Sequence, residues 1–225
     1  MNTLFSFLFC WFFVLTIVAQ KDSLQLGDSY ADDQIYAAIS YSQLYNQPST
    51  ISKSGFSYSI STGFIKDFIL NKEGTISFAA GIGYGYDFFN HELKVENINN
   101  TTVVSSDNTL TSNKFKSHNI EFPLEIRWRT STANRYKFWR IYSGIKFVYN
   151  FSNEFEFIDA NNNTFSYSNI SNYNKLQYGL TLSAGYDAIN IHVFYGLTPI
   201  FENTTIGTEK VETKTLKFGL IFYLL

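Results

Sequence analysis

The chain has 225 residues, of which 45% are hydrophobic, 19% aromatic and 16% charged, and its formal net charge is −2. This hydrophobic content excludes a disordered chain, and the small net charge excludes a global basic field that would attract nucleic acid. Few charges and many aromatic side chains are unusual in a water-exposed domain, so the composition favours a β-rich protein in contact with lipid.

The N-terminal segment, residues 1–19, is predicted to be a secretory signal peptide. Residues 4–19 form a charge-free apolar run, and Ala19 supplies the small residue before a cut that would leave Gln20 as the new N-terminus. The alternative is an uncleaved anchor, but the run is short for the ~20 residues of a spanning helix. The only cysteine, Cys10, lies inside this run. The exported chain would therefore contain no disulfide and no cysteine metal ligand.

After a short periplasmic segment over residues 20–33, we predict that residues 34–225 form one barrel. In the clearest segment, large residues recur at every second position from Ile76 to Phe88, opposite small ones such as Gly81 and Gly83. This is the period of a β-strand. Eight strands are expected, at 34–44, 55–68, 76–88, 119–129, 139–150, 176–187, 189–197 and 213–225. Both faces of the last one are apolar, which leaves its orientation open.

The connections between these segments alternate in length. Those at 45–54, 89–114, 152–174 and 200–212 are long, whereas those at 70–74, 130–137 and 187–188 are short. Short periplasmic turns alternate with longer external loops in transmembrane β-barrels. The sequence therefore predicts an all-β fold, an eight-stranded antiparallel transmembrane β-barrel of the outer-membrane type. Side chains fill the lumen of so small a barrel, so no open pore for large solutes is expected.

Trp128 and Trp139 flank the connection at 130–137. Tryptophan is enriched where a membrane protein meets the interface between lipid and water. Both residues are therefore expected to belong to an aromatic girdle at the periplasmic interface.

Charged side chains on two neighbouring strands are predicted to share the lumen. If the hairpin pairs residues whose numbers sum to 265–267, either Glu125 meets Arg140 or Glu121 meets Lys146. We interpret the set as a structural network that neutralises the lumen, with a role in gating or partner contact as the alternative. Its members are Glu121, Glu125, Arg127, Arg129, Arg140 and Lys146.

The periplasmic end of the same hairpin is locally basic. This end is a candidate docking patch for a periplasmic protein partner, although anionic lipid headgroups would suit it equally. The residues concerned are Arg127, Arg129, Arg135, Lys137 and Arg140.

No group of residues predicts catalysis or cofactor binding. The three histidines are His91, His118 and His192. His118 and Glu121 are three residues apart in one expected strand, which places them on opposite faces and not in one metal site. Ser117 beside His118 offers no nucleophile, base and acid arrangement. We therefore expect a non-enzymatic protein without metal or cofactor.

Four segments resemble the PorT-like outer-membrane barrels of bacteria: 120–129, 136–146, 176–186 and 216–225. The most distinctive stretch is Glu-Phe-Pro-Leu-Glu at 121–125, and the resemblance extends roughly from Asp33 to Leu225. It implies an integral outer-membrane barrel needed for type IX protein secretion and gliding, with secretion-system partners at the periplasmic face. It carries over no catalytic residue.

Two other functions are compatible with a barrel. The first is a structural or adhesive outer-membrane barrel whose loops at 89–114 and 152–174 bind external surfaces. The second is a secreted, lipocalin-like barrel that holds an apolar ligand inside. A lipocalin needs its apolar face inside, whereas the strand face expected to point inward here carries Glu121, Glu125 and Arg127. The pattern therefore favours the membrane over the lipocalin.

Overall fold

The computed structural model describes residues 33–51, 55–98, 101–130 and 139–224. The expected signal peptide, its cleavage site between Ala19 and Gln20, and all of the segment 20–33 except Asp33 lie outside these ranges. Among the described residues, no helix is long and apolar enough to cross a membrane.

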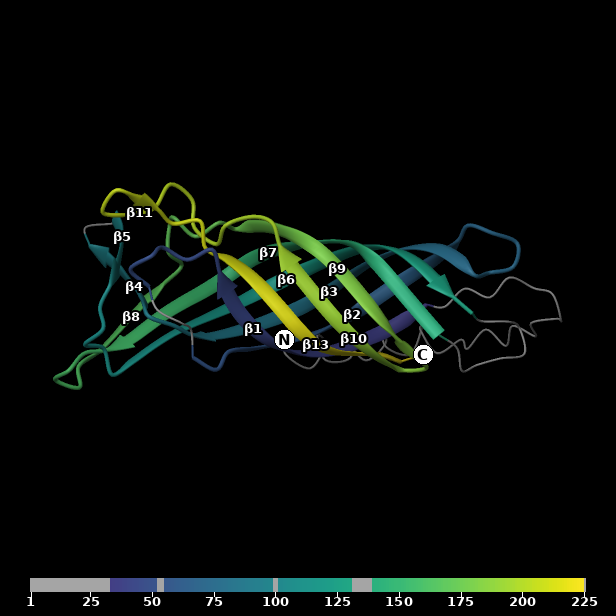
Figure 1. Ribbon diagram of the computed structural model, residues 1–225, viewed down its shortest axis with the longest axis horizontal. Coiled ribbons are helices and arrows are strands. Elements are labelled where there is room, and N and C mark those ends of the chain that lie inside the picture. The colour runs from purple at the N-terminus through teal and green to yellow at the C-terminus, as the bar shows by residue number, and fades with distance from the viewer. Residues whose placement is uncertain (1–32, 52–54, 99–100, 131–138, 225) are drawn as a thin grey trace, which may run out of the picture.

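Eight antiparallel strands form a closed barrel, as the sequence predicts (Figure 1). Each barrel strand pairs with the barrel strands that come before and after it in the sequence. Pairing of the first strand, β1, with the last, β13, closes the sheet. Closure leaves no exposed edge in the lipid, where unpaired backbone groups would be costly. The strands are β1 (Gln34–Tyr45), β2 (Tyr58–Ile69), β3 (Ile76–Asn90), β6 (Ser112–Arg129), β7 (Trp139–Ile158), β9 (Leu176–Tyr186), β10 (Ile189–Gly196) and β13 (Lys214–Leu224).

The long connections hold further strands that the sequence analysis did not predict. These are β4 (Leu93–Ile98), β5 (Thr101–Ser106), β8 (Thr164–Ser168), β11 (Thr205–Ile206) and β12 (Glu209–Lys210). They gather at one end of the barrel, on the left of Figure 1, together with the outer parts of β6 and β7. We call this assembly the head: β4, β5, β8, β11 and β12 with the segments that connect them to the barrel, and residues 112–118 of β6 and 151–158 of β7.

In the body of the barrel, apolar side chains point outward and polar ones point into the lumen. On β6, Ile126 is 54% exposed, whereas Glu125 beside it is 3% exposed. The expected girdle residues Trp128 and Trp139 also lie on the outer surface. A lipid environment stabilises this outer surface, which would be unfavourable in water.

The last strand, whose orientation the sequence left open, turns Ile221 and Tyr223 inward. Both are at most 4% exposed, whereas Leu224 is half exposed on the outside. Ile221 and Tyr223 pack inside the lumen with five residues of other strands: Tyr36, Ala38, Ile65, Ala79 and Tyr142. Both faces are apolar over the last residues of β13 because Ile221 and Tyr223 belong to this lumen cluster.

Lumen glycines make room for larger neighbours. A Cβ atom at Gly83 would overlap the hydroxyl oxygen of Tyr36 and lie 2.7 Å from the carbonyl oxygen of Thr62. We predict that Gly83→Ala lowers the free energy of unfolding by about 1–3 kcal/mol because of this overpacking. Urea unfolding in lipid vesicles, followed by tryptophan fluorescence, measures the effect.

The same substitution in a Tyr36→Phe background is the control. Removing the hydroxyl removes the closest overlap, so the added cost of Gly83→Ala should be smaller there. An equal cost in both backgrounds would contradict the role of Tyr36.

Candidate functional site: the lumen and the head of the barrel

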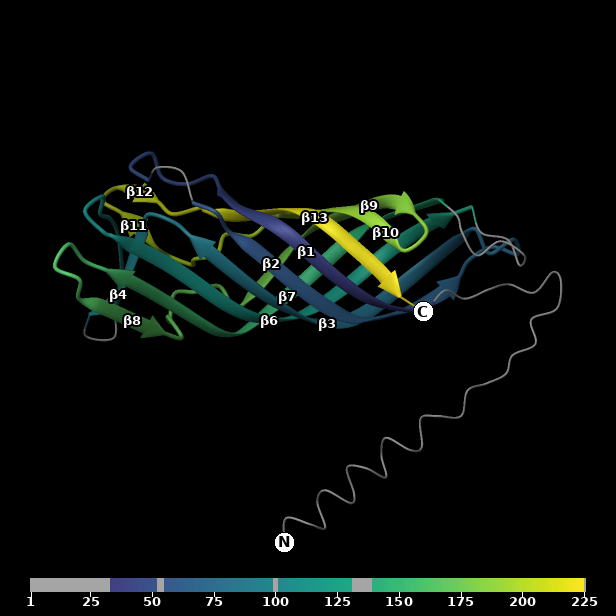
Figure 2. The same ribbon diagram turned by 90° about the horizontal axis from the view of Figure 1, so that it is seen from below.

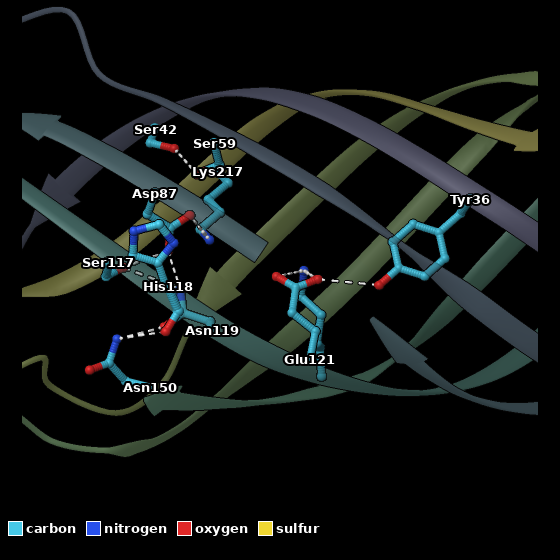
Figure 3. Close-up of polar contacts among 11 residues, drawn as sticks. Tyr36, Ser42, Ser59, Asp87, Ser117, His118, Asn119, Glu121, Asn150 and Lys217 are labelled. Carbon is cyan, nitrogen blue, oxygen red and sulfur yellow. Dashed lines mark hydrogen bonds and ion pairs between the residues drawn. The ribbon is translucent and has the colours of Figure 1, made fainter. Parts of the chain in front are cut away.

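The layer of the lumen nearest the head is organised around Asp87. Its carboxylate lies 2.6 Å from Nζ of Lys217 and accepts a hydrogen bond from Nδ2 of Asn119 at 3.0 Å (Figure 3). Nδ2 of Asn150 in turn donates to Oδ1 of Asn119 at 2.9 Å. These four side chains come from β3, β13, β6 and β7, so the network crosses the lumen. Asp87 and Lys217 are not among the predicted members of the network, although both occupy strand positions whose side chains point into the lumen.

The middle layer is an ion pair between Glu121 on β6 and Lys146 on β7. Nζ of Lys146 lies 2.9 Å from one carboxylate oxygen of Glu121 and 3.0 Å from the other. The hydroxyl of Tyr36 also donates to Glu121, at 3.4 Å. The ion pair is almost completely buried, so each charge depends on its partner for stabilisation.

The layer nearest the other end of the barrel joins two acidic and two basic side chains. Asp67 on β2 lies 2.8 Å from a guanidinium nitrogen of Arg129 and 3.6 Å from one of Arg127. Nε of Arg127 donates to Glu125 at 2.9 Å, and Nε of Arg129 donates to the carbonyl oxygen of Gly74 at 2.8 Å. Asp67 lies outside the predicted network, because the predicted residues all belong to the hairpin of β6 and β7, whereas Asp67 belongs to β2.

The expected register of this hairpin is wrong. Glu125 lies opposite Gly144 and Glu121 opposite Val148, so paired residue numbers sum to 269 and not to 265–267. The carboxylate of Glu121 nevertheless contacts Lys146, because long side chains reach diagonally between strands. Arg129 and Arg140, both buried, face each other at the end of the ladder.

The expected basic docking patch is also wrong for the residues that can be placed. Arg127 and Arg129 are 0% exposed and Arg140 is 4% exposed, so none of them presents a charged surface. Arg127 and Arg129 turn into the lumen because the carboxylates of Asp67 and Glu125 are there. Arg135 and Lys137 lie outside the described residues.

The histidines lie in three separate environments. His118 faces outward and shares a hydrogen bond with the hydroxyl of Tyr84, whereas His192 is in the lumen, bonded to Ser183. His91 is buried in the head. Within the described ranges, no group of three or more His, Cys, Asp or Glu side chains is placed to hold a metal ion.

The head has an apolar core of its own. At its centre the ring of Phe115 stacks on Phe155 with 4.3 Å between centroids, and on Phe89 with 5.5 Å. The core draws on both barrel strands and head segments, and it contains Leu44, Phe89, Leu93, Val95, Val104, Phe115, Phe155, Ile170, Tyr173, Ile200, Phe201 and Val211. The long loops are therefore packed together at one end of the barrel (Figure 2).

Comparison with known proteins identifies the family. Residues 18–202 match the family described as "Outer membrane protein beta-barrel domain". The chain belongs to this family. It is accordingly an outer-membrane β-barrel protein, and the lipid-facing surface described above lies in that membrane.

Among solved structures, this outer-membrane barrel is similar to the crystal structure of Ail, the attachment invasion locus protein of Yersinia pestis. The two are 12% identical, the match covers 85% of this chain and 96% of Ail, and the TM-score is 0.34. A search of curated proteins found no match.

On the side of the head, the lipid-facing surface of this barrel ends at a β-bulge. The register of β6 and β7 shifts between His118 and Asn119, opposite Phe151. Beyond this point the polarity of the two faces reverses: Phe115 and Phe155 turn inward, while the outer face carries cross-strand ion pairs. These pairs join Lys114 to Glu156 and Lys116 to both Glu154 and Glu156. A charged outer face indicates contact with water and not with acyl chains.

The same ion pairs shift the titration of their members. A hydrogen bond from Ser166, together with Lys116, lowers the pKa of Glu154, and Glu154 raises the pKa of Lys116. Both groups therefore stay charged over the ordinary pH range, which keeps this strip of the head compatible with water.

We predict that acid loosens the head through His91. Burial lowers the pKa of His91 to about 4, from an ordinary value of 6.5. The unfolded head binds a proton at His91 more readily than the folded head does. The contribution of neutral His91 to the stability of the head is therefore complete above pH ~6.5 and is lost as the pH falls toward 4. The difference between the two pKa values corresponds to about 3 kcal/mol of stability. Limited proteolysis of the head in vesicles, measured from pH 7 to pH 4, follows this change.

Replacement His91→Asn provides the control for the acid effect. Asparagine keeps a side-chain acceptor for the N–H of Leu93, which donates to Nδ1 of His91 at 3.0 Å, and it does not titrate. The acid-induced loosening should therefore be smaller in this variant. Equal loosening in both proteins would show that another group is responsible.

Proposed function

We propose that this outer-membrane barrel anchors its folded head outside the cell and acts by contacts of that head, without conducting solutes and without catalysis. The observation that carries the proposal is the apolar core of the head, which holds the long loops in a defined shape beyond the membrane boundary. Loops that only connect strands need no core of this size. Ordered loops on a rigid scaffold are a common site of binding function.

The lumen supports an anchoring role. Three layers of hydrogen bonds and ion pairs cross it, at Asp87, at Glu121 and at Asp67, and the cluster around Tyr36 and Tyr223 fills the space between strands. Side chains thus occupy the interior of the barrel, as is usual for eight strands. We interpret the predicted charge network as the structural filling of this lumen.

Attachment of whole cells tests this proposal. Bacteria carrying the full chain are compared with bacteria in which a short turn replaces residues 92–107, which removes the β4–β5 hairpin, and with a deletion strain. We expect attachment to surfaces or to neighbouring cells to fall to the level of the deletion strain. Unchanged attachment, with the shortened barrel present in the outer membrane, would overturn the proposal.

The resemblance to PorT-like barrels suggests one role for these contacts, which is type IX secretion. Export of type IX cargo in the same three strains tests this role. Loss of export in the deletion strain would support the role, and intact export in that strain would contradict it. If the shortened head abolished export as fully as the deletion does, the secretion partner would bind outside and not at the periplasmic face.

A further inference from the structure

The strand β8 lies at the end of the sheet that continues from the barrel into the head. It pairs with the outer part of β7, from Glu154 opposite Ser168 to Ile158 opposite Thr164. On its other side, no described strand pairs with it. Four of its five residues are exposed and Tyr167 is half-buried. The closed barrel has no free edge, so this one belongs to the head alone.

The backbone groups along this free edge can be assigned. The N–H of Asp159 donates to the carbonyl oxygen of Asn163, and the N–H of Asn169 donates to that of Asn153. In an antiparallel pair, hydrogen-bonded and non-bonded positions alternate. Residues 165 and 167 therefore bond to β7, whereas the N–H and C=O groups of Thr164, Ser166 and Ser168 point away from β7.

This edge lacks the features that usually prevent strand addition. Natural edge strands are protected by lysine, proline, bulges or a covering segment. The sequence of β8, Thr-Phe-Ser-Tyr-Ser, contains no charge and no proline. Its inner face is held firmly, because Phe165 stacks on Phe157 with 5.0 Å between ring centroids. The edge is thus both open and fixed in position.

We propose that the free edge of β8 binds an extended, uncharged polypeptide segment of another protein, which adds to the sheet as a further strand. The inference rests on the proposed contact function of the head and names the class of partner. Main-chain hydrogen bonds to residues 164, 166 and 168 would supply the affinity, as in other complexes formed by strand addition. The uncharged surface of β8 would admit a segment without charges on the facing side chains.

A second copy of this chain fits the edge less well. β8 runs antiparallel to β7 and so follows the long axis of the barrel (Figure 1). Two copies inserted in the same membrane have the same orientation, so their β8 strands would run the same way. A symmetric pair of antiparallel strands needs them to run in opposite directions. A segment of a different protein has no such restriction.

Peptide binding to the folded full chain in detergent tests the inference. The probe is a fluorescent, end-capped peptide of alternating threonine and valine with terminal lysines for solubility, and the readout is fluorescence anisotropy. Ser166→Pro removes one N–H of the free edge without removing a backbone hydrogen bond to β7, and proline is tolerated on edge strands. It also removes the side-chain hydrogen bond from Ser166 to Glu154, which Ser168→Pro leaves in place. Ser168→Pro is a second variant of the same kind. Ser166→Thr keeps the N–H and is the matched control.

We expect the wild type and Ser166→Thr to bind the peptide alike, and each proline variant to bind at least about ten times more weakly. Heat-modifiable migration on a gel shows whether each variant is a folded barrel. Absence of binding by the wild type, or equal binding by a folded proline variant, would overturn the inference. A dimer of the wild type that Ser166→Pro abolishes would also overturn the inference, because a second copy of the chain would then occupy the edge. If head-dependent cell attachment persists in any of these cases, the inference fails while the proposed function stands.

Discussion

Replacing Asp67 by alanine is expected to lower the free energy of unfolding by about 3–5 kcal/mol. Its carboxylate faces the guanidinium groups of Arg129 at 2.8 Å and Arg127 at 3.6 Å, and all three side chains are fully buried. The hydroxyl of Ser77 also donates to it, at 2.7 Å. Without this carboxylate, two buried guanidinium groups lose an anionic partner. Urea unfolding in lipid vesicles, read by the fluorescence of Trp128 and Trp139, gives the value.

The neighbouring residue on the same strand provides the control. Lys66 faces outward and forms an ion pair with Asp33 at 3.1 Å, but its side chain is 58% exposed. An exposed pair contributes at most about 1 kcal/mol, so Lys66→Gln should change stability little. In addition, Arg129→Met should restore part of the stability of Asp67→Ala, because it removes one of the uncompensated buried charges. Equal effects of Asp67→Ala and Lys66→Gln would contradict the buried network.

Replacing Phe115 by alanine is expected to unfold the head while the barrel stays intact. Phe115 is 1% exposed and lies between Phe89 and Phe155 in the aromatic stack. Truncating a buried phenylalanine costs about 3–5 kcal/mol, and here the loss is confined to the core of the head. Limited proteolysis and hydrogen exchange in vesicles should show new cleavage and faster exchange around residues 91–111 and 159–173. Cell attachment should fall as the head unfolds.

The matched control for the head is Phe115→Leu. Leucine fills most of the same space, so the cost should stay below about 1.5 kcal/mol and the loops should remain protected. Heat-modifiable migration should be preserved in both variants because the barrel strands below the bulge do not depend on this ring. Loss of the barrel in Phe115→Ala would show that head and barrel fold as one cooperative unit.

The sequence by itself determined the eight barrel strands and, where the alternation is regular, their inward and outward faces. Alternation in segments such as 120–128 depends only on the two-residue period of a strand and on the difference between lipid and lumen, so it can be read without a partner strand. The same alternation put Glu121 and Lys146 on the inner surface. The tertiary structure brings these two into contact.

Only the tertiary structure decided which residues meet across the lumen and what the loops form. The register of β6 and β7 depends on how the 131–138 connection closes, which strand periodicity cannot specify. Asp67 and Asp87 join the network because barrel closure brings β2, β3 and β13 around the same space. Phe155 was expected in a loop and Phe115 lies outside the expected strands, yet both form the core of the head for a similar reason. A core is a set of long-range contacts, and these depend on how distant segments pack together.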